Sequence, residues 1–136
     1  MTSKEIRNGA TMIILNKNNQ ILILKRDKND KYSPSLWCVP GGRVEKESFE
    51  ECIKKEVKEE TNLEIKELNF FKSYFRDEGN FYYQPVYFYG KTVGEIKLNY
   101  EHEEYKWISK EELDNYKFAF GQDKILKEFF KTINLI

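Results

Sequence analysis

Three glutamates in one short stretch, Glu56, Glu59 and Glu60, have the residue type and the spacing to hold a metal ion. On a helical wheel of about 100° per residue with Phe49 at zero, Glu56 falls near 340° and Glu60 near 20°. Glu59 lies close to the edge of the same arc, which also carries the apolar side chains expected to be buried: Cys52, Ile53 and Val57. A buried, ionised carboxylate costs several kcal/mol, so this pattern predicts a bound cation or a retained proton.

The stretch has two interpretations. A Lys/Glu-rich surface helix would gain only a few tenths of a kcal/mol from each i,i+4 pair. A metal site is favoured because the carboxylates share the apolar arc, and because the turn Gly41-Gly42 before them can bring backbone close to a ligand. Hard oxygen ligands favour Mg²⁺, or Mn²⁺, over Zn²⁺.

A metal held in this way suits phosphate chemistry. The ion bridges phosphate oxygens and lowers the pKa of a bound water, while a carboxylate that is not fully occupied takes the water's proton. Glu56, or a residue further along the chain, is the candidate base. The natural target is a pyrophosphate linkage, because it offers two adjacent anionic groups to such a site.

The elements that must position these glutamates can be read from the chain. Ser48 and Glu51 form a capping box that starts a helix over Phe49–Thr61, and Asn62 suits a left-handed stop. The other expected elements are a hairpin over 9–15 and 21–26, an aromatic hairpin over 64–76 and 81–91 with Pro85 at an edge or bulge, a strand over 105–108, and helices over 109–116 and 122–133. The pattern predicts one domain, residues 1–136, folded as an α/β sandwich with a mixed β-sheet between helices.

Composition narrows the class of protein. Lysines plus arginines and acids number 23 each, which argues against binding to a nucleic acid polymer or to a membrane surface. No signal or membrane-spanning segment is expected, and the two cysteines suggest a reduced, cytoplasmic protein. The arginines able to grip phosphate with a bidentate fork are Arg7, Arg26, Arg43 and Arg76.

The segment Gly41 to Leu63 resembles the Nudix box, G-x5-E-x7-R-E-U-x-E-E-x-G-U, where U is a bulky aliphatic residue. Three positions depart from the box. Lys55 replaces the arginine and loses its fork, and Asn62 replaces the glycine but tolerates positive φ. The turn to Glu47 is one residue shorter than the common form.

The resemblance implies a Nudix-type α/β/α sandwich and metal-dependent hydrolysis of a nucleoside diphosphate linked to another group. It places the metal on Glu56, Glu59 and Glu60, with a backbone carbonyl of Gly41 or Gly42. In MutT-like members, which act on (d)NTPs or related nucleotides, a further acidic ligand matches Glu101. The remaining candidates for binding the substrate are Arg26 or Arg43 for a phosphate, and Phe118 or Phe120 for stacking on the base.

The resemblance leaves alternatives open. His102 and its neighbours also resemble GDP-mannose mannosyl hydrolases, in which a histidine at the equivalent place serves as base, so a catalytic or substrate-binding role for His102 and a nucleotide-sugar substrate are the second interpretation. A third is a non-catalytic module that senses a nucleotide. The sequence does not decide between a monomer and a homodimer.

Overall fold

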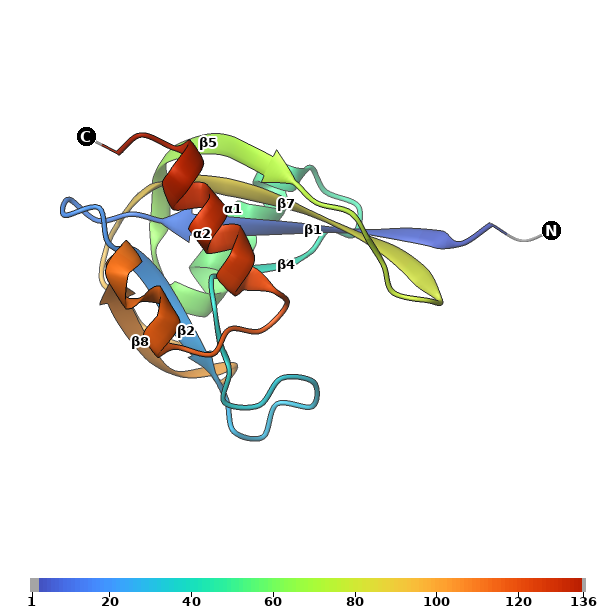
Figure 1. The fold of residues 1–136 in the computed structure, drawn as a ribbon, viewed down its shortest axis with the longest axis horizontal. Helices are drawn as coiled ribbons and strands as arrows, with labels where there is room; N and C mark the ends of the chain where they lie inside the picture. The colour runs from blue at the N-terminus through green and yellow to red at the C-terminus, as the bar shows by residue number, and fades with distance from the viewer. Residues whose placement is uncertain (1–2, 136) are drawn as a thin grey trace.

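The computed structural model describes residues 3–135, which form two β-sheets and three helical segments (Figure 1). The larger sheet has the strand order β4-β1-β7-β5, with β6 also paired to β7. Its strands are β1 (Glu5–Ile14), β4 (Gly41–Arg43), β5 (Glu64–Ser73), β6 (Arg76–Asp77) and β7 (Phe81–Val93). Because β1 and β7 are parallel and the other pairs antiparallel, the sheet is mixed, as predicted.

The smaller sheet has the order β3-β2-β8, all antiparallel. Its strands are β3 (Trp37–Cys38), β2 (Ile21–Arg26) and β8 (His102–Ile108). The register of β2 against β8 shifts between Lys25 and Arg26, so that Arg26 lies opposite His102. Such a bulge re-aims the side chain at the end of the strand.

Helix α1 (Phe49–Thr61) covers one face of the strands, and α2 (Gln122–Thr132) with the 3₁₀ helix η1 (Lys110–Asn115) covers the other (Figure 1). In β1, Met12 and Ile14 pack in the core with α1, whereas Ile13 packs in the core with α2. Strands buried on both faces explain the apolar runs in the sequence. The predicted α/β/α sandwich is confirmed.

The first predicted hairpin is wrong. β1 and β2 are consecutive in the chain but belong to different sheets, and only a single bridge, Leu15 to Ile21, joins them. The polar turn between them reverses the chain, yet the partners of β1 are β4 and β7, both further away in sequence than β2. Pro85 is also not at an edge, because β7 lies between β1 and β5; it falls where pairing passes from β5, at Val86, to β6, at Tyr83.

The predicted ends of α1 are confirmed. The Ser48 side chain accepts a hydrogen bond from the Glu51 amide, and Asn62 adopts the left-handed conformation with φ 68°. The Asn62 amide donates to the Lys58 carbonyl, which closes the last turn of the helix. Within residues 3–135, no helix is long and apolar enough to cross a bilayer.

Asn62 stands where the box has glycine, and variants at this residue measure the cost of its positive φ. We expect Asn62→Ala to unfold more easily than Asn62→Gly by about 1 kcal/mol, because a Cβ is disfavoured at positive φ. Both variants lose the same side-chain hydrogen bond to the Glu95 carbonyl, so the comparison isolates the backbone. Urea unfolding measures the difference, and an Ala variant as stable as the Gly variant would contradict it.

Candidate active site

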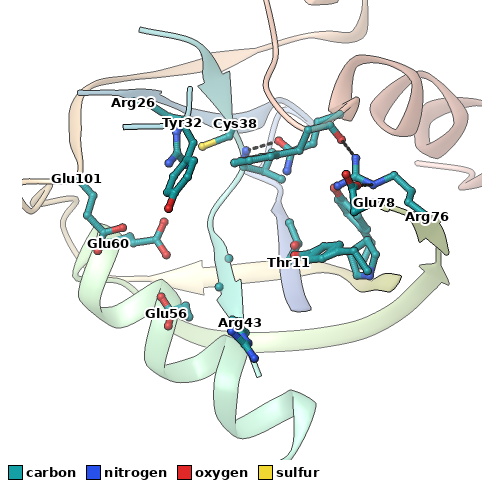
Figure 2. Close-up of a pocket in the computed structure, with 18 of the residues that line it drawn as sticks. Thr11, Arg26, Tyr32, Cys38, Arg43, Glu56, Glu60, Arg76, Glu78 and Glu101 are labelled. Atoms are coloured by element: carbon teal, nitrogen blue, oxygen red, sulfur yellow. Dashed lines mark hydrogen bonds and ion pairs between the residues drawn. The ribbon is translucent and has the colours of Figure 1, made fainter. Parts of the chain in front are cut away.

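A pocket of about 570 Å³ opens beside the start of β4, and residues from both sheets, α1 and the loop before α2 line it. Figure 2 shows its two ends. Glu60 and Glu101 lie together at one end, and Arg76 with Glu78 lies at the other. The pocket is therefore acidic at one end and carries a charged pair at the other.

The acidic end comes from two elements that are distant in sequence. Glu56 and Glu60 project from successive turns of α1, and Glu101 precedes β8. Glu60 is 2% exposed, and its Oε2 is buried with no hydrogen-bond partner. A buried carboxylate oxygen without a partner is costly, so this atom favours the binding of a proton or a cation.

Burial shifts the protonation of both helix carboxylates. Burial, a hydrogen bond with Glu56 and the charge of Glu101 raise the pKa of Glu60 well above its usual value. Burial raises the pKa of Glu56 as well, with the charge of Glu59 adding to the effect. The two groups thus form a coupled pair that favours retaining a proton when no cation is near.

Gly42 lets β4 approach Glu56, and Gly41 lets the same strand pack closely against β1. A Cβ on Gly42 would lie 2.4 Å from Cδ of Glu56, and one on Gly41 would lie 2.6 Å from the Ala10 carbonyl oxygen. Both sites exclude a side chain. The shortened turn that follows is held by Glu47, whose carboxylate accepts a hydrogen bond from the Glu45 amide, and β4 still pairs with β1.

The donor set fits a hard divalent cation, because the acidic end offers carboxylate oxygens and one of them has no partner. Glu59 is exposed and does not line the pocket. Across residues 3–135, no three Asp, Glu, His or Cys side chains already stand in an arrangement that could hold a metal ion. Two carboxylates of α1, Glu56 and Glu60, are thus gathered at the pocket, whereas the third, Glu59, lies outside it.

Three of the four arginines line the pocket, and each already has a carboxylate partner. Arg26 contacts Asp30 at 2.7 Å, and Arg43 contacts Glu5 at 3.1 Å. The third, Arg76, contacts Glu78 at 3.1 Å. A guanidinium carries five N–H donors, so one carboxylate leaves the others free for phosphate.

Phe120 forms part of an aromatic wall and is held there against its backbone preference. Its φ is 59°, which is strained for a bulky residue. Arg76 donates a hydrogen bond of 2.9 Å to the Phe120 carbonyl, and the guanidinium of Arg26 lies 5.0 Å from the ring centroid. The aromatic residues Phe81 and Tyr83 of β7 also line the pocket.

His102 is a buried strand residue and lies ahead of the strand that was expected over 105–108. It is 5% exposed at the start of β8 and does not line the pocket. Its Nε2 lies 3.5 Å from Sγ of Cys38 and 3.8 Å from Oε1 of Glu60. Burial, with the charge of Arg26, lowers the pKa of His102 to about 4, so the ring is neutral at pH 7. It packs against Glu60 from outside the pocket.

Sequence reasoning did not single out several of the lining residues, among them Glu78 and Tyr32, and it named Arg76 only as one of four candidate arginines. Arg76 and Glu78 sit at the tip of the aromatic hairpin, where a polar turn was expected, and Tyr32 belongs to a polar loop. The single signal was that Arg76 is one of four arginines in the chain.

Comparison with known proteins agrees with this geometry. A NUDIX domain model matches residues 5–129. The chain is 33% identical over 125 residues to an ADP-ribose pyrophosphatase of Methanocaldococcus jannaschii, covering 89% of this chain and 72% of that protein. It is 31% identical over 124 residues to an 8-oxo-dGTP diphosphatase of Buchnera aphidicola, covering 88% and 91%.

Solved structures share the fold. The MutT protein of Methanosarcina mazei Go1 superposes with a TM-score of 0.83 at 25% identity, covering 96% of this chain and 97% of that one. Fold and relatives define a hydrolase of phosphorus-containing anhydrides in nucleotides. The chain belongs to the Nudix family, which generally uses a divalent metal such as Mg²⁺, and within it is MutT-like.

The buried Glu60 makes the stability of the metal-free protein depend on pH. Its folded-state pKa is raised above the ordinary carboxyl value of 4.5, so the folded state holds a proton that the unfolded chain releases. This stabilisation is complete below pH 4.5 and is lost as pH rises through the folded-state pKa.

We therefore expect the melting temperature of the wild type in EDTA to fall more steeply between pH 5 and pH 8 than that of Glu60→Gln, whose amide does not titrate. Thermal unfolding followed by circular dichroism measures both slopes. Equal slopes would show that Glu60 does not hold the proton.

Proposed function

We propose that this Nudix hydrolase cleaves the pyrophosphate linkage of a nucleoside triphosphate, ordinary or damaged, and releases a nucleoside monophosphate and pyrophosphate. The observation that carries the proposal is the acidic end of the pocket, where Glu60 keeps a buried oxygen without a partner beside Glu56 and Glu101. The 8-oxo-dGTP diphosphatase of Buchnera supports this substrate class.

We assign the metal, Mg²⁺ with Mn²⁺ as a substitute, to Glu56, Glu59, Glu60 and Glu101 and to a backbone carbonyl of Gly41. When bound, the ion would polarise the phosphoryl group and lower the pKa of a water. Glu59 joins this set from the exposed side of α1, where its charge already acts on Glu56.

Glu56 is the proposed general base. It is half-buried rather than sealed, it lines the pocket, and burial raises its pKa above the ordinary carboxyl value. A base works best when its pKa approaches the working pH, so this environment suits the acceptance of a proton from water. His102, neutral and packed against Glu60, is assigned the support of that carboxylate rather than contact with the nucleotide.

The rest of the pocket suits a nucleotide. Arg26 and Arg43 are assigned to the phosphates, because both line the pocket and keep free donors. Phe120 is assigned to the base, since the residue is 43% exposed, Arg76 bonds its carbonyl and Arg26 lies over its ring.

A parallel screen tests the proposal. Nucleoside triphosphates, ADP-ribose and nucleotide sugars are incubated with the protein and Mg²⁺ at mildly alkaline pH, and the products are separated by chromatography. We expect monophosphate and pyrophosphate from triphosphates. Cleavage of ADP-ribose alone would contradict the triphosphate assignment and favour the substrate of the Methanocaldococcus relative. Release of free sugar from a nucleotide sugar would favour a nucleotide-sugar hydrolase.

The same assay tests the assigned base. Glu56→Gln should lower kcat about 10²–10⁴-fold, which is the range for general-base catalysis. Glu64→Gln is the matched control, because Glu64 is exposed on β5, lies outside the pocket and pairs with Lys58. An active Glu56→Gln variant would refute the assignment, and a nucleotide bound tightly but left intact would favour a sensing module.

A further inference from the structure

The loop between β2 and β3 is closed at its base by two backbone hydrogen bonds, and Arg26 takes part in both. The Arg26 amide donates to the Leu36 carbonyl at 2.8 Å, and the Ser35 amide donates to the Arg26 carbonyl at 3.2 Å. These two bonds form a neck, and residues 27–35 project from it beside the pocket. The conformation of this loop and the position of Arg26 therefore depend on the same few atoms.

Asp30 ties the loop to the Arg26 side chain. Its Oδ2 accepts a hydrogen bond of 2.7 Å from Nη2 of Arg26, while its Oδ1 accepts from the amides of Tyr32 and Ser33 at 3.0 and 2.8 Å. The side chains of Asp30 and Arg26 are each only 19% exposed, so solvent screens this ion pair less than one on the surface. One carboxylate thus fixes both the guanidinium and the turn that follows.

The electrostatics of Asp30 agree with this contact. Burial alone would raise its pKa, but the hydrogen bonds from Ser33, Tyr32 and Arg26 hold the pKa below its usual value. Asp30 therefore stays ionised at neutral pH and remains a partner for the guanidinium.

Two further contacts set the position of Arg26. The bulge between Lys25 and Arg26 turns the residue at the strand end, and the Phe120 ring lies 5.0 Å from the guanidinium. Asp30 supplies the charged contact among these three. It does not itself line the pocket, whereas Arg26 and Tyr32 do.

Tyr32 extends the effect of Asp30 to the acidic end. Figure 2 shows its ring between Arg26 and the carboxylates, with the hydroxyl pointing toward Glu60 and Glu101. The ring is 79% exposed, so its direction depends on the backbone that Asp30 holds.

We infer that Asp30 is a positioning residue for substrate binding: it holds Arg26 and the base of Tyr32 in the places from which they contact the nucleotide phosphates. The inference rests on the proposed function, because Arg26 is assigned to phosphate there. An arginine held in place loses less conformational freedom when the ligand binds, so removing its partner weakens affinity more than it slows the chemistry.

The test compares Asp30→Asn with the wild type on the nucleoside triphosphate cleaved best in the screen. The amide oxygen of asparagine still accepts from the Tyr32 and Ser33 amides, so the loop keeps its turn while the charge is lost. We expect KM to rise about tenfold with kcat within about twofold. Asp30→Ser, which keeps a hydroxyl acceptor, should raise KM as much and serves as the second variant.

The matched control is Asp27→Asn. Asp27 lies in the same loop, and its carboxylate bonds the Asn29 amide rather than Arg26, so KM should stay within about twofold of the wild type. An unchanged KM in both Asp30 variants, or an equal rise in Asp27→Asn, would overturn the inference.

A double-mutant cycle separates positioning from simple loop folding. In an Arg26→Gln background, Asp30→Asn should change KM by less than about twofold, because the group through which it acts is gone. An undiminished rise there would show that Asp30 acts only through the loop.

Calorimetric binding of a nucleoside triphosphate with a methylene group in place of the α,β-bridging oxygen, with Mg²⁺ present, distinguishes the two levels of failure. A wild type that neither binds nor cleaves would contradict both proposals. Binding that is equal in the wild type and in Asp30→Asn would overturn the role of Asp30 alone.

Discussion

The carboxylate of Glu60 is the constraint around which the pocket is built, because it lies in the interior with one oxygen unpaired. Its helix must be apolar enough to pack on the sheet, through Ile53 and Val57, and yet carry this group on the same face. Burial, Glu56 and the charge of Glu101 raise the pKa of Glu60, so a retained proton reduces this cost when no cation is bound. A divalent cation would bind the same oxygens and displace that proton. The residue that is costly for the fold is therefore also the one that the proposed chemistry uses.

The site also depends on contacts that cross the whole chain. Glu60 belongs to α1, Glu101 precedes β8 of the smaller sheet, and Gly42 brings β4 of the larger sheet against Glu56. The opposite charges follow a similar logic. Arg26 and Arg43 are each paired with a carboxylate outside the acidic end, and each keeps N–H donors free. Both guanidinium groups can therefore lie near the acidic end without forming ion pairs with its glutamates.

What the sequence predicted, and what it did not, follows the range of the physical signals. α1 was predicted to the residue because its cap, its stop at Asn62 and its apolar arc are all local. The first hairpin failed because a turn signal reverses the chain without choosing a partner, and the parallel pairing of β1 with β7 leaves no local mark. Helical spacing predicted that Glu56 and Glu60 lie on the buried side of α1, where both line the pocket, whereas Glu59, at the edge of the arc, is exposed. The strained backbone of Phe120 and the contact between Asp30 and Arg26 arise from tertiary structure.

The most direct test of the central claim is metal binding itself, measured without any substrate. Mn²⁺ is titrated into the wild type, Glu60→Gln and Glu64→Gln, and free Mn²⁺ is followed by electron paramagnetic resonance. We predict a site in the wild type and in Glu64→Gln that weakens at least about tenfold in Glu60→Gln. Equal Mn²⁺ affinity in all three proteins would contradict the account, because the buried carboxylate would then not be the group that holds the ion.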